Sequence, residues 1–186
     1  MTNQSIFDNQ QKKILVKQEK TIQIFITGGT FDKSYDYIEG ALYFKETHLP
    51  EMLKRSRCQL DIQIETLMMM DSLEMGVKET DQIIVACQNS PCQKIVITHG
   101  TDKMVATAKA LAKAKAKANL KNKTILLPGA MIPYAFGGSS DGFFNLGCAL
   151  SYVQTLTQDV YITMQGQSFL WNEVQKNSLL GRFEKI

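Results

Sequence analysis

Residues 94–102 read Lys94-Ile95-Val96-Ile97-Thr98-His99-Gly100-Thr101-Asp102, and they carry the clearest structural signal in the sequence. After the lysine, the residues up to position 98 are apolar or β-branched without a break, which is typical of a short buried strand. The polar residues 99–102 follow at once, and a segment with a helical pattern comes after them. A strand, a tight polar turn and a helix in this order place Thr101 and Asp102 at the carboxyl end of a strand, where open α/β sheets bind ligands.

A second turn of the same kind, Thr27-Gly28-Gly29-Thr30, follows the strand-like residues 21–26. Glycines let a backbone turn sharply and approach a ligand without an intruding Cβ atom. Exposed amides in such a turn can bind an anion, and Thr30 can present a free hydroxyl. The same residues also suit an ordinary turn. They lack the third glycine of a dinucleotide fingerprint and the lysine and length of a P-loop, so a phosphate-binding domain is the weakest interpretation.

The composition indicates one soluble globular domain. The chain has 186 residues, of which 44% are hydrophobic and 21% are charged, and this length can bury a core without metals or disulfides. The net charge is only +3, which excludes a concentrated basic surface for nucleic acid. Four lysines recur at four-residue intervals in one predicted helix, and we interpret them as a solvated face: Lys109, Lys113, Lys117 and Lys121.

The start of the chain and its cysteines favour an intracellular, cytoplasmic protein. Residues 1–20 are polar and contain no apolar core of signal-peptide length, so we expect a flexible tail before a single domain at 21–186. No segment approaches the length of a membrane span. We expect the four cysteines to be buried free thiols: Cys58, Cys87, Cys92 and Cys148.

Strand-like and helix-like segments alternate along the chain, which predicts a mostly parallel sheet with helices on both faces. The expected strands are residues 21–26, 61–67, 94–98, 123–128 and 160–164, with a strand-like pair of turns near 41–44. The expected helices are 47–57 with Thr47 as its cap and Pro50 in its first turn, 80–89 with Thr80 as its cap, a long helix after Asp102, and one from Ser140-Asp141 to Val153. The expected irregular segments are a loop at 31–40 over the site, turns at 68–74 and 132–140, and the end of the chain after Gly166.

Thr101 and Asp102 suit a nucleophilic relay. A hydroxyl is a poor nucleophile near neutral pH and needs a base with an orienting partner. A lysine can be that base, and a carboxylate can hold the lysine in place. His99 is an alternative base, although a histidine on the strand side of a glycine turn also suits a structural role, with its ring bound by backbone.

Two further motifs give the sequence a family resemblance. With Gly129-Ala130-Met131 and Ser140-Asp141-Gly142 downstream, the two threonine turns resemble those of the bacterial-type L-asparaginase/glutaminase family, over residues 21 to about 184. The ending, with Trp171 to Lys176 and Gly181-Arg182-Phe183, resembles the short, single-domain asparaginase-like proteins, which carry only the amino-terminal half of the enzyme. The resemblance implies a three-layer αβα fold with a mostly parallel open sheet.

The resemblance also implies catalytic roles. Thr30 resembles the nucleophile that attacks the side-chain amide carbon and forms an acyl-enzyme. Thr101 resembles the second threonine of the family, with Lys176 and Asp102 completing its relay. Tyr35 lies in the loop where the family keeps a tyrosine beside the nucleophile.

The same resemblance implies a set of substrate-binding groups. Ser72 resembles the serine that binds the α-carboxylate, and Asp102 would hold the α-amino group. Ala130 would offer its backbone to the substrate, and amides of the turn at Gly29 would stabilise the oxyanion. Two positions depart from the family, which usually has threonine in place of Lys103 and, in the larger enzymes, glutamine in place of Leu73.

We therefore expect an amidohydrolase that releases ammonia from the side chain of L-asparagine or a related small amide. The resemblance implies no metal and no organic cofactor. Full-length family members have a second domain that adds residues to the neighbouring subunit's site, and we expect this sequence to lack it. The alternative is a non-catalytic or weakly active protein that binds an amino acid. We expect the protein to bind a small-molecule amide, to bind neither nucleic acid nor a membrane, and to form a homo-oligomer.

Overall fold

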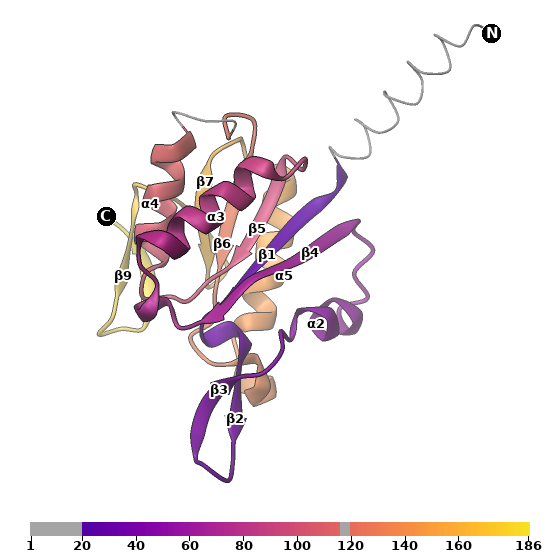
Figure 1. The fold of residues 1–186 in the computed structure, drawn as a ribbon, viewed down its shortest axis with the longest axis vertical. Coiled ribbons are helices and arrows are strands. Elements are labelled where there is room, and N and C mark those ends of the chain that lie inside the picture. Colours follow the sequence, from indigo (N-terminus) through magenta and orange to yellow (C-terminus); the bar gives the residue numbers. More distant parts are fainter. Residues whose placement is uncertain (1–19, 116–119) are drawn as a thin grey trace, which may run out of the picture.

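The computed structural model describes residues 20–115 and 120–186, and six of its strands form one sheet in the order β4-β1-β5-β6-β7-β8 (Figure 1). The first five are parallel to one another, and β8 is antiparallel to β7. Their bounds are Ile22–Gly28 (β1), Ile62–Met70 (β4), Lys94–Thr98 (β5), Thr124–Pro128 (β6), Val160–Met164 (β7) and Gln167–Leu170 (β8). The predicted mostly parallel open sheet is confirmed.

Helices cover both faces of this sheet, which confirms the three-layer αβα fold (Figure 1). Buried side chains of α3 (Val77–Asn89) and α4 (Met104–Lys115) pack with Phe25 against one face. Those of α2 (Leu49–Arg55) and α5 (Gly142–Thr155) pack with Ile24 and Ile26 against the other. Successive residues of β1 point to opposite faces, and both kinds of position are apolar because both faces are covered.

Two short hairpins stand outside the main sheet, and both correct the sequence analysis. The expected loop at 31–40 contains β2 (Lys33–Asp36), which pairs with β3 (Ala41–Phe44) in a hairpin that projects from the body (Figure 1). Strand β3 coincides with the strand-like residues 41–44 of the sequence analysis. The end of the chain after Gly166 is expected to be irregular, but after β8 it forms a hairpin of β9 (Val174–Asn177) and β10 (Arg182–Lys185). Four-residue strands are too short for a period-2 pattern to stand out.

Two helix starts and one turn also differ from expectation. Helix α3 begins at Val77, because the Glu79 carboxylate accepts the Gly76 N–H at 2.8 Å; Thr80, the expected cap, donates its hydroxyl to the Gly76 carbonyl instead. Helix α2 begins at Leu49, two residues after the expected cap. Strand β4 continues to Met70 through the expected turn, pairing there with β1 after an irregularity in register. Three short 3₁₀ helices occupy other turns: η1 (Thr30–Asp32), η2 (Ser72–Glu74) and η3 (Tyr134–Ser139).

All four cysteines are free thiols; Cys87 and Cys92 are buried, whereas Cys58 and Cys148 are only partly buried. Burial raises the pKa of the Cys87 thiol to about 12, so it is an inert core group. Within the residues that the structure describes, no helix has the length and apolar character needed to span a bilayer. The predicted tail, apart from Lys20, and Lys117 of the predicted lysine face lie outside the described residues.

Backbone contact joins the carboxyl ends of the central strands. Gly29, at the end of β1, has φ 69°, and a Cβ atom there would lie 2.4 Å from the Gly100 nitrogen after β5. A Cβ atom on Gly100 would in turn lie 2.5 Å from the Ser72 hydroxyl oxygen after β4. Side chains larger than hydrogen cannot be accommodated at either glycine without displacing a neighbouring turn. The two threonine turns are therefore packed directly against each other.

Replacing Gly29 with alanine should destabilise the protein more than replacing Gly40, which also has a positive φ, 65°, but open space at its Cβ position. Gly29→Ala combines backbone strain with a clash, so we expect the free energy of unfolding to fall by about 2–5 kcal/mol. Gly40→Ala adds strain alone, at about 1–2 kcal/mol. Urea unfolding measures both losses, and equal values would contradict the need for close contact between the turns.

Candidate active site

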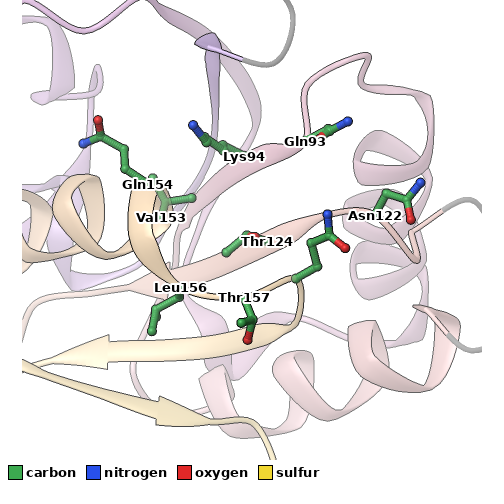
Figure 2. Close-up of a pocket in the computed structure, with 9 residues that line it drawn as sticks. Gln93, Lys94, Asn122, Thr124, Val153, Gln154, Leu156 and Thr157 are labelled. Carbon is green, nitrogen blue, oxygen red and sulfur yellow. The ribbon is translucent and has the colours of Figure 1, made fainter.

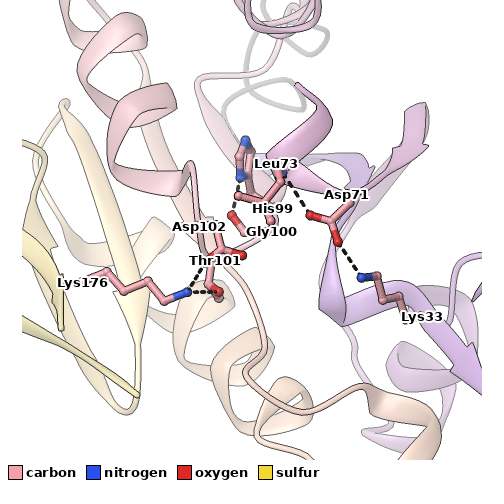
Figure 3. A network of polar contacts seen from close by, with 8 residues as sticks. All are labelled: Lys33, Asp71, Leu73, His99, Gly100, Thr101, Asp102 and Lys176. Carbon is pink, nitrogen blue, oxygen red and sulfur yellow. Dashed lines mark hydrogen bonds and ion pairs between the residues drawn. The ribbon is translucent and has the colours of Figure 1, made fainter. Parts of the chain in front are cut away.

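Lys176 joins the two polar residues of the β5 turn (Figure 3). Its Nζ atom donates to Thr101 Oγ1 at 2.9 Å and to Asp102 Oδ1 at 2.6 Å. Thr101 is only 5% exposed, and the lysine side chain is 14% exposed, whereas that of Asp102 is 45% exposed. The structure thus brings Lys176 to a threonine and an aspartate that precede it by 75 and 74 residues in the sequence.

The elements that hold these groups come from distant parts of the chain. Thr101 and Asp102 follow β5 directly and precede α4, so the strand and the helix fix their backbone between them. Lys176 lies on β9, whose buried Val174 is part of the core between the sheet and α4. The lysine therefore reaches the carboxyl edge of the sheet from one side, while its own hairpin stays outside the sheet.

Thr30 begins η1 immediately after Gly29 and is partly buried. Because Gly29 contacts Gly100, the Thr30 turn lies beside the turn that carries Thr101. The Gly29 N–H donates to the Met70 carbonyl at 2.8 Å. This amide is bonded within the fold, and Gly29 also allows the close approach of the two turns. The role of the amides of this turn in stabilising an oxyanion stays a prediction.

The hydroxyl of Ser72 is one of several buried polar groups that have no hydrogen-bond partner among the described residues, and Ser72 is only 1% exposed. Burial of a hydroxyl without a partner is costly, so native proteins rarely keep one without a reason such as a ligand or water. Ser72 lies against Gly100, which places this hydroxyl beside the threonine turns.

Figure 3 shows a second lysine–aspartate pair, Lys33 with Asp71, and Asp71 directly precedes Ser72 in the chain. Lys33 Nζ donates to Asp71 Oδ2 at 2.5 Å, and the Leu73 N–H donates to Asp71 Oδ1 at 3.0 Å. The hydrogen bond from Lys33, with that from the Leu73 backbone, lowers the pKa of Asp71. Sequence reasoning missed this pair. The available signal was opposite charge beside each motif, with Lys33 three residues after Thr30 and Asp71 just before Ser72.

Ala130 is fully buried in the turn after β6, which α5 holds in place. The Asp141 carboxylate accepts the N–H of Met131 at 2.9 Å, and the Asn145 amide donates to the Gly129 carbonyl at 2.9 Å and to Asp141 at 2.9 Å. Asn145 was not singled out from the sequence. The available signal was a polar residue at helical spacing from the apolar residues Ala149 and Val153.

His99 is fully buried, and its Nδ1 atom lies 2.8 Å from the Gly100 carbonyl oxygen, to which it donates (Figure 3). Burial lowers the pKa of His99 to about 4, so the ring is neutral near pH 7. This arrangement matches the structural role rather than that of a general base.

Tyr35 lies on β2, away from the relay. The residue is 49% exposed, and its ring packs against that of Phe136 in η3, with centroids 6.0 Å apart. None of the contacts recorded for the described residues joins it to Thr30, Thr101 or Lys176. The structure therefore places Tyr35 on the projecting hairpin without bringing it to the other predicted site residues.

A hollow of about 370 Å³ lies at the opposite edge of the sheet (Figure 2). Its walls include Lys94 and Thr124, the first residues of β5 and β6, and amide side chains such as Gln93, Asn122 and Gln154. None of the predicted site residues lines it. Among the described residues no group of three or more His, Cys, Asp or Glu side chains could hold a metal ion.

The sequence is similar to a family profile and to two curated relatives. A family profile described as "Asparaginase, N-terminal" matches residues 21–182. One subunit of the glutamyl-tRNA(Gln) amidotransferase of Pyrococcus furiosus is 31% identical over 159 residues, which cover 82% of this chain and 35% of that protein. The corresponding protein of Pyrococcus abyssi is 29% identical over 154 residues, covering 79% and 34%.

Solved L-asparaginases have the same fold. L-asparaginase I of Vibrio cholerae superposes with a TM-score of 0.74 at 23% identity, covering 90% of this chain and 51% of the other. The thermostable L-asparaginase of Thermococcus kodakarensis gives 0.71 at 24%, covering 89% and 51%. A probable cytoplasmic L-asparaginase of Campylobacter jejuni gives 0.73 at 26%, covering 90% and 53%. The chain thus spans about a third of the amidotransferase subunits and half of these asparaginases.

The buried histidine predicts a specific pH dependence of stability. The pKa of His99 is about 4 in the folded protein against 6.5 for a free histidine, so its contribution is fully present above pH 6.5 and is lost as the pH falls toward 4. At pH 5 the wild type should have lost about 2 kcal/mol of unfolding free energy through this residue. Urea unfolding at pH 7.5 and pH 5 should show a smaller loss for His99→Gln, and equal losses would contradict a neutral buried ring.

Proposed function

Because this chain belongs to the asparaginase family, we propose that it is an amidohydrolase that cleaves a side-chain amide to the acid and ammonia. The observation that carries the proposal is the contact of Lys176 with both Thr101 and Asp102. A threonine hydroxyl needs a base within hydrogen-bond reach, and the base needs a third group to orient it. The lysine amine and the aspartate carboxylate supply both.

In the proposed mechanism Thr30 is the nucleophile. Its hydroxyl oxygen forms a bond to the amide carbon, and its proton leaves through the relay of Thr101 and Lys176. Lys176, 2.9 Å from Thr101 Oγ1, can accept a proton in its neutral form and return one, while Asp102 holds the amine in place. The carbon–nitrogen bond then breaks, the nitrogen departs as ammonia with a proton, and an ester on Thr30 remains. Water cleaves that ester and releases the acid.

We assign substrate recognition to three groups around the turns. The buried hydroxyl of Ser72 lacks a partner among the described residues, which supports its binding of the substrate's α-carboxylate. Asp102 is partly exposed, so its carboxylate can also bind an α-amino group. The turn that contains Ala130, fixed by Asp141 and Asn145, would present its backbone to the substrate. Tyr35 would join the site only if the β2–β3 hairpin moved.

The substrate that we propose is L-asparagine or a related small amide. The solved relatives are named as L-asparaginases, and the curated relatives as subunits of a glutamyl-tRNA(Gln) amidotransferase. Both names support chemistry on an amide nitrogen. Ser72 and Asp102 are proposed to bind an α-carboxylate and an α-amino group, which favours a free amino acid as substrate. We further propose that residues 21–186 act as one domain in a cytoplasmic homo-oligomer. The edge strand β4, with Ile64 exposed, supports such association.

The relay predicts the behaviour of three variants in an ammonia-release assay with L-asparagine, L-glutamine and D-asparagine. Thr30→Ala removes the nucleophile, and Thr101→Val and Lys176→Met each break the proton path. We expect each to lower kcat by about 100-fold or more, because general acid–base groups contribute that much. Thermal unfolding should show that all three remain folded.

A threonine outside the site provides the matched control. Thr155 ends α5, and among the described residues its hydroxyl donates to the carbonyls of Ser151 and Tyr152 on its own helix, so Thr155→Val should keep wild-type turnover. Wild-type rates in Thr101→Val and Lys176→Met would exclude the relay. Tight binding of an amino acid by the wild type with no ammonia from any of the three amides would favour the binding-protein alternative.

A further inference from the structure

The turn between β7 and β8 has an unusual residue, Gln165, in a left-handed conformation. Its φ is 56°, and that of the following Gly166 is 78°. Two-residue hairpin turns with both φ values positive strongly prefer asparagine, aspartate and glycine. A longer side chain at the first position carries about 1–2 kcal/mol of backbone strain. Such strain persists only where the surroundings enforce it, so the contacts of this residue indicate its purpose.

Two side chains of helix α5 form hydrogen bonds with the backbone of this turn. The Gln165 N–H donates to Asn145 Oδ1 at 2.8 Å, and the Tyr152 hydroxyl donates to the Gly166 carbonyl at 2.9 Å. Asn145 is fully buried and also bonds the Gly129 carbonyl of the turn after β6. The position of Gln165 is therefore fixed relative to the carboxyl edge of the sheet.

The side chain of Gln165 reaches the hairpin that carries Lys176. Its Nε2 atom donates to the Gly181 carbonyl at 3.0 Å, and its Oε1 atom accepts the Phe183 N–H at 3.1 Å. Phe183 pairs directly with Lys176 across the β9–β10 ladder. Gln165 thus binds the backbone of the residue opposite the lysine.

Few polar contacts attach this hairpin to the rest of the protein. Within the described chain, the hydrogen bonds that join residues 174–185 to other segments come from two side chains, two from Gln165 and two from Lys176. Val174 and Phe183 also bury their side chains in the core. Apolar burial holds the hairpin against the body but has little directionality, whereas the paired bonds of one amide fix its orientation.

We propose that Gln165 is a positioning residue that sets Lys176 at hydrogen-bonding distance from Thr101, a role that rests on the proposed amidohydrolase function. The glutamine amide anchors β10, the strand pairing carries that position to β9, and the lysine amine meets the threonine. Displacement of a catalytic group by about 1 Å can cost about 100-fold in rate, so a distant anchor of this kind matters to turnover.

Kinetics of three substitutions test the role of the amide. Gln165→Ala removes it, and we expect kcat to fall about 10- to 100-fold with KM within about twofold, because the substrate-binding groups are elsewhere. Gln165→Asn suits the left-handed turn better but is one methylene too short, so it should resemble Gln165→Ala. Gln165→Gly relieves the strain and should also be slow. Wild-type kcat in the asparagine or glycine variant would show that only the turn conformation matters.

Two controls separate positioning from a general loss of stability. Gln154→Ala removes an amide that also donates to a carbonyl, that of Leu150, but on α5 away from the hairpin, and it should keep wild-type kcat. In a cycle with Lys176→Met, the double variant Gln165→Ala/Lys176→Met should be no slower than Lys176→Met alone, because both changes act through one amine. Fully multiplicative losses would overturn the proposal.

A measurement without substrate separates this proposal from the proposed function. The rate at which acetic anhydride acetylates Lys176 can be followed by peptide mass spectrometry, with Lys33 as an internal reference. The Lys176 amine is partly buried and makes two hydrogen bonds, so it should react slowly in the wild type and at least several-fold faster in Gln165→Ala. Unchanged reactivity would overturn the positioning role even if ammonia is released. Faster reactivity in a protein that releases no ammonia would support positioning and exclude the proposed reaction.

Discussion

Contact between the backbones of Gly29 and Gly100 is the constraint on which the candidate site depends. The two glycines lie in the turns that follow neighbouring strands, β1 and β5, and no side chain fits between them. Gly100 also lies against Ser72, and Gly129 lies against the His99 carbonyl, so the turns after β1, β4, β5 and β6 share one compact region. The hydroxyl residues that follow or lie beside these glycines are gathered by the packing of the turns.

Charge around this region is arranged as two separate pairs. Lys176 with Asp102 lies on one side of the β5 turn, and Lys33 with Asp71 lies beside Ser72 (Figure 3). His99, between the turns and the core, is kept neutral by burial. Of the basic side chains in the candidate site, Lys176 alone contacts a threonine hydroxyl through a recorded hydrogen bond in the described chain. The proton relay of the proposed mechanism depends on that contact.

Sequence reasoning recovered the sheet because the central strands are continuous apolar runs, as residues 94–98 illustrate. It also grouped Thr101, Asp102 and Lys176, through family resemblance rather than from any pattern of spacing. The four-residue strands β2, β9 and β10 were missed because local periodicity is too weak to mark them. Lys33–Asp71 and Gln165–Phe183 are long-range pairs, and no local pattern in one sequence specifies a partner 18 or 38 residues away.

The most direct test of the account is to find which threonine carries the acyl group during turnover. The protein would be mixed with L-asparagine, quenched in acid within milliseconds, digested, and analysed by peptide mass spectrometry. The account predicts an aspartyl ester on the peptide that contains Thr30 and none on the peptide that contains Thr101. An ester on Thr101, or turnover with no ester on Thr30 at any quench time, would contradict it.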